Sequence, residues 1–187
     1  MEQYEMVNLL RGGIPTTPQL WADFGAGTGN FSWALAELLA NGSTIYALDR
    51  DAKAIRAQQE RLAVNPPPVP ILPILADVTK PLQLPLLNGI LMANLLHFLR
   101  DQARFLRSLT PLLHTNWRIL VVEYEQATPI PWVPFPMPFA TLRTTAGTLG
   151  WHAHMLNTRQ SPSSGRMMYA ASLTAHQVDE YPNQSSS

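Results

Sequence analysis

A short apolar run, a glycine-rich turn and an amphipathic run follow one another within residues 19–40, and this succession constrains the fold more than any other feature. The run QLWADF is typical of a buried strand, and NFSWALAELLA places apolar residues at helical spacing until NG ends it. Between them, Gly25, Gly27 and Gly29 supply the backbone freedom that a tight strand-to-helix turn requires. The succession therefore predicts one strand-helix unit of a parallel sheet.

The rest of the chain continues this alternation. Further strands are expected at residues 43–49, 71–77, 86–94 and 117–124, and further helices at residues 2–11, 52–63, 98–113 and 139–149. The closing strands, 151–159 and 166–175, are separated by the turn QSPSSG, which predicts an antiparallel hairpin. Strands joined through helices predict a parallel sheet with helices on both faces. In the segment 98–113, the side chains expected to face the core are Phe98, Phe105, Leu106 and Leu109.

Composition and charge narrow the class of protein. Lys and Arg together number 13, as do Asp and Glu, so no net positive field favours nucleic acid as a partner. Cysteine is absent, which removes thiolate metal sites and cysteine nucleophiles, and no metal is expected. The first residues do not resemble a signal peptide, and the longest apolar run is too short for a membrane span. We therefore expect a cytoplasmic protein with one domain over residues 1–176 and a disordered polar tail at residues 177–187.

The spacing of the glycines distinguishes among the ligands that such a turn can bind. The dinucleotide motif G-x-G-x-x-G requires a third glycine where this chain has Asn30. A phosphate-binding P-loop requires Gly-Lys-Ser/Thr after four spacers, and no lysine lies near the turn. Asp23, at the end of the expected strand, would repel a pyrophosphate but suits a ligand that carries an ammonium group. Both phosphate-binding interpretations are therefore disfavoured.

With its leading acid and three glycines, the segment DFGAGTG resembles the D-x-G-x-G-x-G motif of class I S-adenosylmethionine-dependent methyltransferases. The resemblance covers residues 2–175, because the order of elements and the closing hairpin are also similar. It implies an α/β fold, a Rossmann-like three-layer sandwich with a seven-stranded, mostly parallel sheet and a C-terminal antiparallel hairpin. It also implies S-adenosylmethionine as the cofactor. The residues of the motif expected to hold it are Asp23, Gly25, Ala26, Gly27 and Gly29.

Polar residues at the ends of the next strands suit the same ligand. Asp49 follows the glycines by about twenty residues, where a carboxylate can accept hydrogen bonds from both ribose hydroxyls. The resemblance implies that Asp77 accepts from the adenine amino group, that the Val78 amide meets a ring nitrogen and that Asn94 lines the methionine end. Arg50 is a further candidate for contact with adenine or ribose. The alternatives are a helix cap for Asp49 and a plain turn residue for Asp77.

Candidates for a general base follow the fourth and fifth strands. We expect His97 or Glu123 to take up the proton of a methyl acceptor, since many methyl transfers need only a base of modest strength. The alternatives are that His97 caps or packs against a helix and that Glu123 or Glu125 caps the following loop. Weaker candidates are Tyr124, His152 and His154.

The acceptor is expected beneath two segments that cover the carboxyl edge of the sheet. Tyr4 in the first helix, with Trp132 and Phe135 in the loop PIPWVPFPMPF, offers an apolar surface that suits a small, partly hydrophobic molecule. The alternative is a rigid loop whose aromatic side chains only cover the sheet edge.

The favoured function is the transfer of a methyl group from S-adenosylmethionine to a small-molecule acceptor. A non-catalytic S-adenosylmethionine-binding or regulatory protein is the alternative, since no residue is an unambiguous base. A nicotinamide oxidoreductase is disfavoured by Asn30. The acceptor and the oligomeric state are not predicted.

Overall fold

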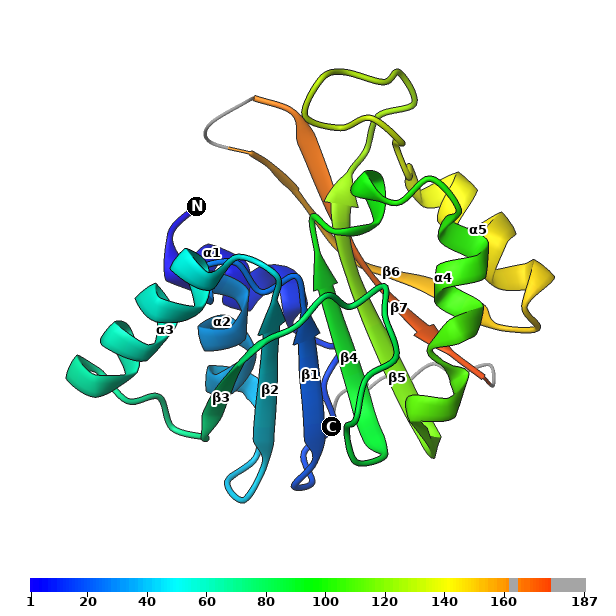
Figure 1. Cartoon of the computed structure of the whole chain (residues 1–187). Helices are drawn as coiled ribbons and strands as arrows, with labels where there is room; N and C mark the ends of the chain where they lie inside the picture. The colour runs from blue at the N-terminus through cyan, green and yellow to red at the C-terminus, as the bar shows by residue number, and fades with distance from the viewer. Residues whose placement is uncertain (162–164, 176–187) are drawn as a thin grey trace, which may run out of the picture.

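The strands form one seven-stranded sheet in a computed structural model that describes residues 1–161 and 165–175 (Figure 1). They are β1 (Leu20–Phe24), β2 (Thr44–Asp49), β3 (Ile71–Leu75), β4 (Leu87–Ala93), β5 (Leu113–Tyr124), β6 (His152–Gln160) and β7 (Met167–Thr174). Their order is β3-β2-β1-β4-β5-β7-β6. β1 to β5 run parallel, and β7 is antiparallel to both β5 and β6. The predicted fold class, including the closing hairpin, is confirmed.

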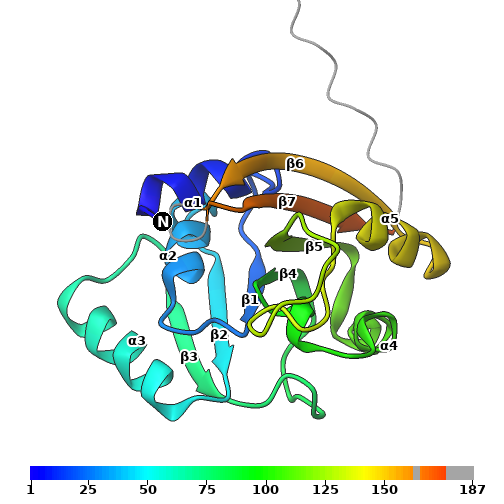
Figure 2. The same cartoon turned by 90° about the horizontal axis from the view of Figure 1, so that it is seen from above.

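Helices cover both faces of this sheet. They are α1 (Gln3–Leu10), α2 (Asn30–Leu38), α3 (Ala52–Val64), α4 (Gln102–Ser108) and α5 (Phe139–Thr148). Seen from above, α1, α2 and α3 lie on one face, and α4 and α5 lie on the other (Figure 2). Side chains alternate along β1, so the strand contributes to the core on both faces of the sheet. Trp21 packs in the core beneath α1 and α2, and Phe24 packs in the core on the opposite face. Both side chains are fully buried.

The glycine turn lies where the strand order reverses. β1 pairs with β2 on one side and with β4 on the other. The chain passes from β1 to β2 through α2, and it returns to β4 from β3 at the edge of the sheet. In open parallel sheets, ligands bind outside the carboxyl ends of the strands at such a point. The turn after Phe24 is therefore placed for ligand binding.

The helix predicted at residues 98–113 is wrong in extent. The chain instead forms a short 3-10 turn at Leu96–Phe98, the helix α4 and a second 3-10 turn at Thr110–Leu112. Asp101 starts α4 by accepting a hydrogen bond from the Arg104 amide, so Phe98 lies outside the helix and is 54% exposed. The prediction that Phe98 faces the core is thus wrong, whereas the other three side chains predicted to face it, Phe105, Leu106 and Leu109, are buried.

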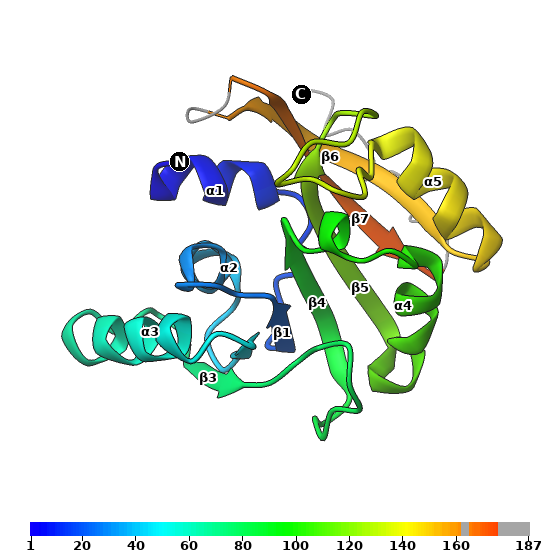
Figure 3. The ribbon, with the colours of Figure 1, turned by 45° about the horizontal axis from the view of Figure 1, so that its top comes forward.

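The helix α1 is attached to the closing hairpin, beside which it lies in Figure 3. Asn157 of β6 donates hydrogen bonds to the carbonyls of Leu9 (3.2 Å) and Arg11 (3.0 Å) at the end of the helix. Arg159 of β6 pairs with the buried carboxylate of Glu5. The N-terminal helix and the last strands therefore form one wall of the molecule.

Within residues 1–161 and 165–175, none of the helices has both the length and the apolar character that crossing a membrane requires. The predicted polar tail at residues 177–187 lies outside the described residues.

Candidate active site

All three glycines of the turn adopt left-handed backbone angles, with φ of 73° at Gly25, 55° at Gly27 and 86° at Gly29. Other residues adopt these angles only at a cost in strain. The amides of Gly25 and Ala26 both donate to the Leu48 carbonyl of β2 at 2.9 Å, which holds the turn against the neighbouring strand. A Cβ atom on Gly29 would lie 2.7 Å from the Trp33 ring. The structure therefore confirms that the backbone of this turn requires glycine, as predicted from the sequence.

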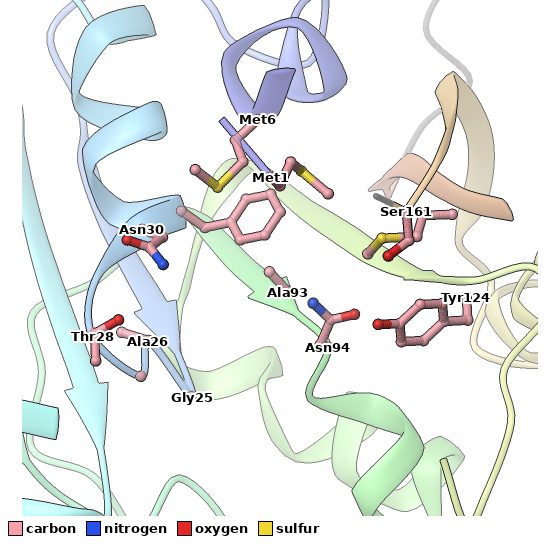
Figure 4. Close-up of a pocket in the computed structure, with 13 residues that line it drawn as sticks. Met1, Met6, Gly25, Ala26, Thr28, Asn30, Ala93, Asn94, Tyr124 and Ser161 are labelled. Atoms are coloured by element: carbon pink, nitrogen blue, oxygen red, sulfur yellow. The ribbon is translucent and has the colours of Figure 1, made fainter. Parts of the chain in front are cut away.

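Two cavities flank the turn and meet at Gly25 and Asn94, which line both. The turn cavity, of about 400 Å³, lies between the glycine turn, α1 and the ends of β4, β5 and β7 (Figure 4). The strand-end cavity, of about 300 Å³, lies at the ends of β2 and β3 and beside the segment after β4. Together they form a divided pocket along the carboxyl edge of the sheet.

Asp49 lies in the wall of the strand-end cavity and also holds the glycine turn. Its Oδ2 accepts from the Gly27 amide at 2.7 Å, and its Oδ1 accepts from the Asp51 amide at 2.8 Å. Each carboxylate oxygen can accept a second hydrogen bond. The N-cap of α3 is Asp51, whose side chain accepts from Lys53, so Asp49 is not the cap of that helix.

Asp77 lines the same cavity together with Val78 and Arg50. Its Oδ1 accepts from the Thr79 hydroxyl at 2.6 Å and from the Thr79 amide at 2.9 Å. These hydrogen bonds lower the pKa of the Asp77 carboxyl group. Asp77 is therefore held as an ionised hydrogen-bond acceptor at the cavity edge.

Asp23 lies beneath the turn and does not line either cavity. Only 1% of the residue is exposed, and its Oδ2 accepts from the buried Ser32 hydroxyl at 2.6 Å. Burial raises the pKa of Asp23 to about 7. This position argues against the expected direct contact with an ammonium group and favours an indirect role through the turn.

Asn94 stands at the junction of the two cavities. It is the one residue other than glycine with a positive φ (57°) in the described parts of the chain, a conformation that Asn tolerates better than most residues. Its amide donates to Val122 at 2.8 Å, while its side-chain Oδ1 is buried and has no hydrogen-bond partner among the described residues. In Figure 4 the side chain points toward the Tyr124 hydroxyl. An unpaired buried oxygen in a cavity wall is suited to a ligand that donates a hydrogen bond.

His97 and Glu123 form a buried pair behind the cavities. Nδ1 of His97 lies 2.6 Å from Oε2 of Glu123, and the His97 amide donates to Oε1 at 3.2 Å. The residues are 2% and 1% exposed. When Glu123 accepts from Nδ1–H, Nε2 is left as the basic nitrogen of the imidazole. The ring of His97 also packs against Phe98 and Tyr124, which line the two cavities.

Comparison with known proteins identifies the family. Residues 22–116, just over half of the chain, match a family model described as a methyltransferase domain. The chain belongs to this methyltransferase family. A search among curated proteins gives no match. The family agrees with the resemblance found in the sequence and disfavours a nicotinamide oxidoreductase.

Solved methyltransferase structures share the fold at low sequence identity. An S-adenosylmethionine-dependent methyltransferase from Aquifex aeolicus is 14% identical with a TM-score of 0.67, over 92% of this chain and 87% of that chain. The CcbJ methyltransferase from Streptomyces caelestis is 13% identical with a TM-score of 0.68, over 91% and 88%. Magnesium protoporphyrin IX methyltransferase from Synechocystis PCC 6803, with bound S-adenosylhomocysteine, is 15% identical with a TM-score of 0.63, over 85% and 74%.

The methyltransferase does not bring every candidate residue to the cavities. Tyr4, Trp132 and Phe135 are 64%, 57% and 37% exposed, and none of them lines either cavity. His152 and His154 lie exposed on β6, away from both cavities, and Glu125 caps α5 by accepting from the Phe139 amide at 3.0 Å. The turn cavity is lined instead by side chains that the sequence did not single out, among them Phe31 and Met168.

Proposed function

We propose that this chain transfers a methyl group from S-adenosylmethionine to a small-molecule acceptor, with the cofactor spanning both cavities. The observation that carries the proposal is the junction of the cavities at Gly25 and Asn94, beside a turn of three left-handed glycines. The adenosine end is assigned to the strand-end cavity and the amino-acid end to the turn cavity.

The residues present fit the chemical groups of this cofactor. Asp49 and Asp77 offer carboxylate acceptors to ribose hydroxyls and to the adenine amino group. Gly25 and Gly27 leave the turn without side chains, so a ligand can approach the backbone closely. When bound, S-adenosylmethionine supplies an electrophilic methyl group on a positively charged sulfur. Asp23 supports this site from below, and Arg50, Val78 and Asn94 complete its walls.

The chain contributes orientation and a proton acceptor to the reaction. Holding the reacting groups in one geometry within a cavity that excludes water can lower a barrier by several kcal/mol, up to about 10 kcal/mol. We assign the role of general base to His97, which lines neither cavity itself and borders them through Phe98 and Tyr124. Glu123, which binds both the ring and the amide of His97, has a positioning role. A base of this kind would distinguish an enzyme from the alternative of a non-catalytic S-adenosylmethionine-binding protein.

The lining of the turn cavity supports a small, partly apolar acceptor. Met6, Phe31 and Met168 surround the space next to Tyr124, and the volume of about 400 Å³ is within the range of small-molecule sites. Trp132 and Phe135 belong to a loop that reaches the site through its backbone, because the Phe135 amide donates to the His97 carbonyl at 3.0 Å. We propose that these two aromatic residues, with Tyr4, contact the acceptor when this loop and α1 close over it.

Thermal unfolding tests the cofactor. S-adenosylhomocysteine is expected to raise the melting temperature of the protein, and NAD is not, since a ligand that binds only the folded state stabilises it. Stabilisation by NAD alone would contradict the proposal.

Incubation with S-adenosylmethionine and a panel of hydroxyl- and amine-bearing small molecules then tests catalysis. Cofactor binding without methyl transfer to any acceptor would favour the non-catalytic alternative.

Replacing Asp49 tests the ribose assignment. Asp49→Ala removes acceptors for two hydroxyls and is expected to raise the dissociation constant of S-adenosylhomocysteine about 100-fold, measured by calorimetry. Asp51→Ala is the matched control, because Asp51 is exposed and caps α3. The control is expected to lose about 1 kcal/mol of stability and to keep its affinity. An unchanged dissociation constant for Asp49→Ala would reject the assignment.

A further inference from the structure

Gln58 is the polar member of the buried side of α3. Of the residues of this helix, Ala54, Ile55 and Gln58 are buried, and Gln58 is 0% exposed. Its Nε2 donates to the Gly27 carbonyl at 2.6 Å, whereas its Oε1 is buried without a partner among the described residues. An apolar side chain at this position would avoid the unpaired Oε1, but it would leave the Gly27 carbonyl without its donor. The glutamine is therefore explained by its contact with the glycine turn.

The Gly27 residue is held at both of its backbone groups. Asp49 accepts from its amide at 2.7 Å, and Gln58 donates to its carbonyl at 2.6 Å. Because Gly27 has a φ of 55° and no side chain, little else restrains the direction of its carbonyl. Two elements, the end of β2 and the middle of α3, thus fix one peptide unit of the turn.

Fixing the Gly27 carbonyl also fixes the direction of the next amide, the N–H of Thr28. In a trans peptide the C=O and the following N–H point in opposite directions, so fixing the Gly27 carbonyl toward α3 directs the Thr28 N–H away from α3. Thr28 lines the turn cavity, and its N–H donates to no other residue of the described chain. Holding the Gly27 carbonyl therefore fixes the direction of the Thr28 N–H, a backbone donor of a residue that lines the turn cavity.

We propose that Gln58 is a positioning residue that aims the Thr28 N–H at the carboxylate of the cofactor's amino-acid end. This inference rests on the proposed function and extends it to a residue outside the glycine motif. Gln58 does not line either cavity, so its effect on binding is transmitted through the Gly27 peptide.

Two ligands that differ in the amino-acid end, which includes the carboxylate, test the proposal. S-adenosylhomocysteine carries the amino-acid end, and 5′-methylthioadenosine has the same adenosine and sulfur without it. Gln58→Met has similar length and lacks the donor, and it is expected to weaken S-adenosylhomocysteine about tenfold while changing the dissociation constant of methylthioadenosine less than twofold. Gln59→Met is the matched control, since Gln59 is the exposed neighbour on the same helix, and it is expected to change neither.

Each other result is decisive. Equal weakening of both ligands, or no weakening of either, overturns the role of Gln58 in orienting Thr28. Gln58→Leu repeats the test with a second side chain that lacks the donor, which covers the case in which Gln58→Met does not fold. If the unaltered protein binds neither ligand, the proposed function itself fails, and that result is distinct from any change between variants.

Discussion

The buried carboxyl group of Asp23 makes the stability of this protein depend on pH. The pKa of Asp23 is raised from 3.8 to about 7 by burial, so the folded state binds the proton more tightly than the unfolded state does. The stability gained from this proton is fully present below about pH 4 and is lost as the pH rises to about 7. At higher pH the folded protein carries an ionised carboxylate in the core.

Asp23→Asn is therefore expected to stabilise the protein most at pH 8 and less at pH 5, where the folded protein still keeps the proton of Asp23. Asparagine cannot ionise, and its Oδ1 can still accept from Ser32. The expected gain at pH 8 is about 2 kcal/mol or more, since one pKa unit corresponds to about 1.4 kcal/mol. Urea unfolding at the two pH values measures the difference. A loss of stability at pH 8 would show that the ionised carboxylate is compensated in the folded state.

The two oxygens of Glu123 predict a kinetic effect that is separate from binding. Glu123→Gln replaces one of two acceptors by an NH₂ group, so the His97 ring either loses its partner or accepts from that NH₂ at Nδ1, which puts the ring proton on Nε2. We expect the methyl-transfer rate constant to fall at least 100-fold while the affinity for S-adenosylhomocysteine stays within twofold. Glu125→Gln is the control, because Glu125 caps α5 and contacts neither cavity. Equal rates in both variants would remove the pair from the mechanism.

At the scale of elements, the attachment of α1 to β6 predicts that Asn157, a side chain far from the cavities in the sequence, affects the binding of the acceptor. Asn157→Ala removes the hydrogen bonds to the Leu9 and Arg11 carbonyls at the end of α1. We expect a loss of about 1 to 2 kcal/mol of stability, faster hydrogen exchange within α1, and a higher KM for the acceptor because Met6 of this helix lines the turn cavity. Thr158→Ala, at the exposed next position of β6, is expected to change none of these. Unchanged exchange in α1 for Asn157→Ala would contradict the attachment.

The elements themselves were largely predictable because their signals are local. The apolar run, the three glycines and the amphipathic run of residues 19–40 each act through neighbouring residues, and β1, the turn and α2 lie where the pattern places them. The segment 98–113 failed for an equally physical reason. Its apolar spacing is helical, but the cap at Asp101 starts α4 after Phe98, which is exposed. Pro111 lies in a 3-10 turn beyond the end of α4.

Residues of the candidate site could be predicted only where a polar residue stands at the end of a strand that is itself recognisable in the sequence. Asp49 ends β2 and Asp77 lies two residues after β3, and the structure places both in one cavity wall. The pairing of His97 with Glu123 depends on the register of β4 and β5, and the place of Met168 depends on β7 lying beside β5. These contacts join residues far apart in the chain, so no local pattern in the sequence predicts them.

For the whole molecule, the divided pocket joins both halves of the sheet. The strand-end cavity contacts residues after β2, β3 and β4, whereas the turn cavity reaches from the glycine turn and α1 to β5 and β7. A ligand that fills one cavity should therefore restrain only the segments around it, and a ligand that fills both should restrain the two halves together. If the cofactor is divided between the cavities as proposed, a ligand that lacks the amino-acid end should restrain only the segments around the strand-end cavity.

Hydrogen exchange with the two ligands of different length makes this measurable. Methylthioadenosine is expected to slow amide exchange at residues 76–79 and 95–99, which line or adjoin the strand-end cavity, and to leave residues 28–31 and α1 unchanged. S-adenosylhomocysteine is expected to slow exchange in all of these segments, because its amino-acid end enters the turn cavity between Thr28 and Met6. Residues 102–108 of α4 line neither cavity and serve as the internal control. If both ligands gave the same protection, the division of the cofactor between the two cavities would be wrong even though binding itself was correct.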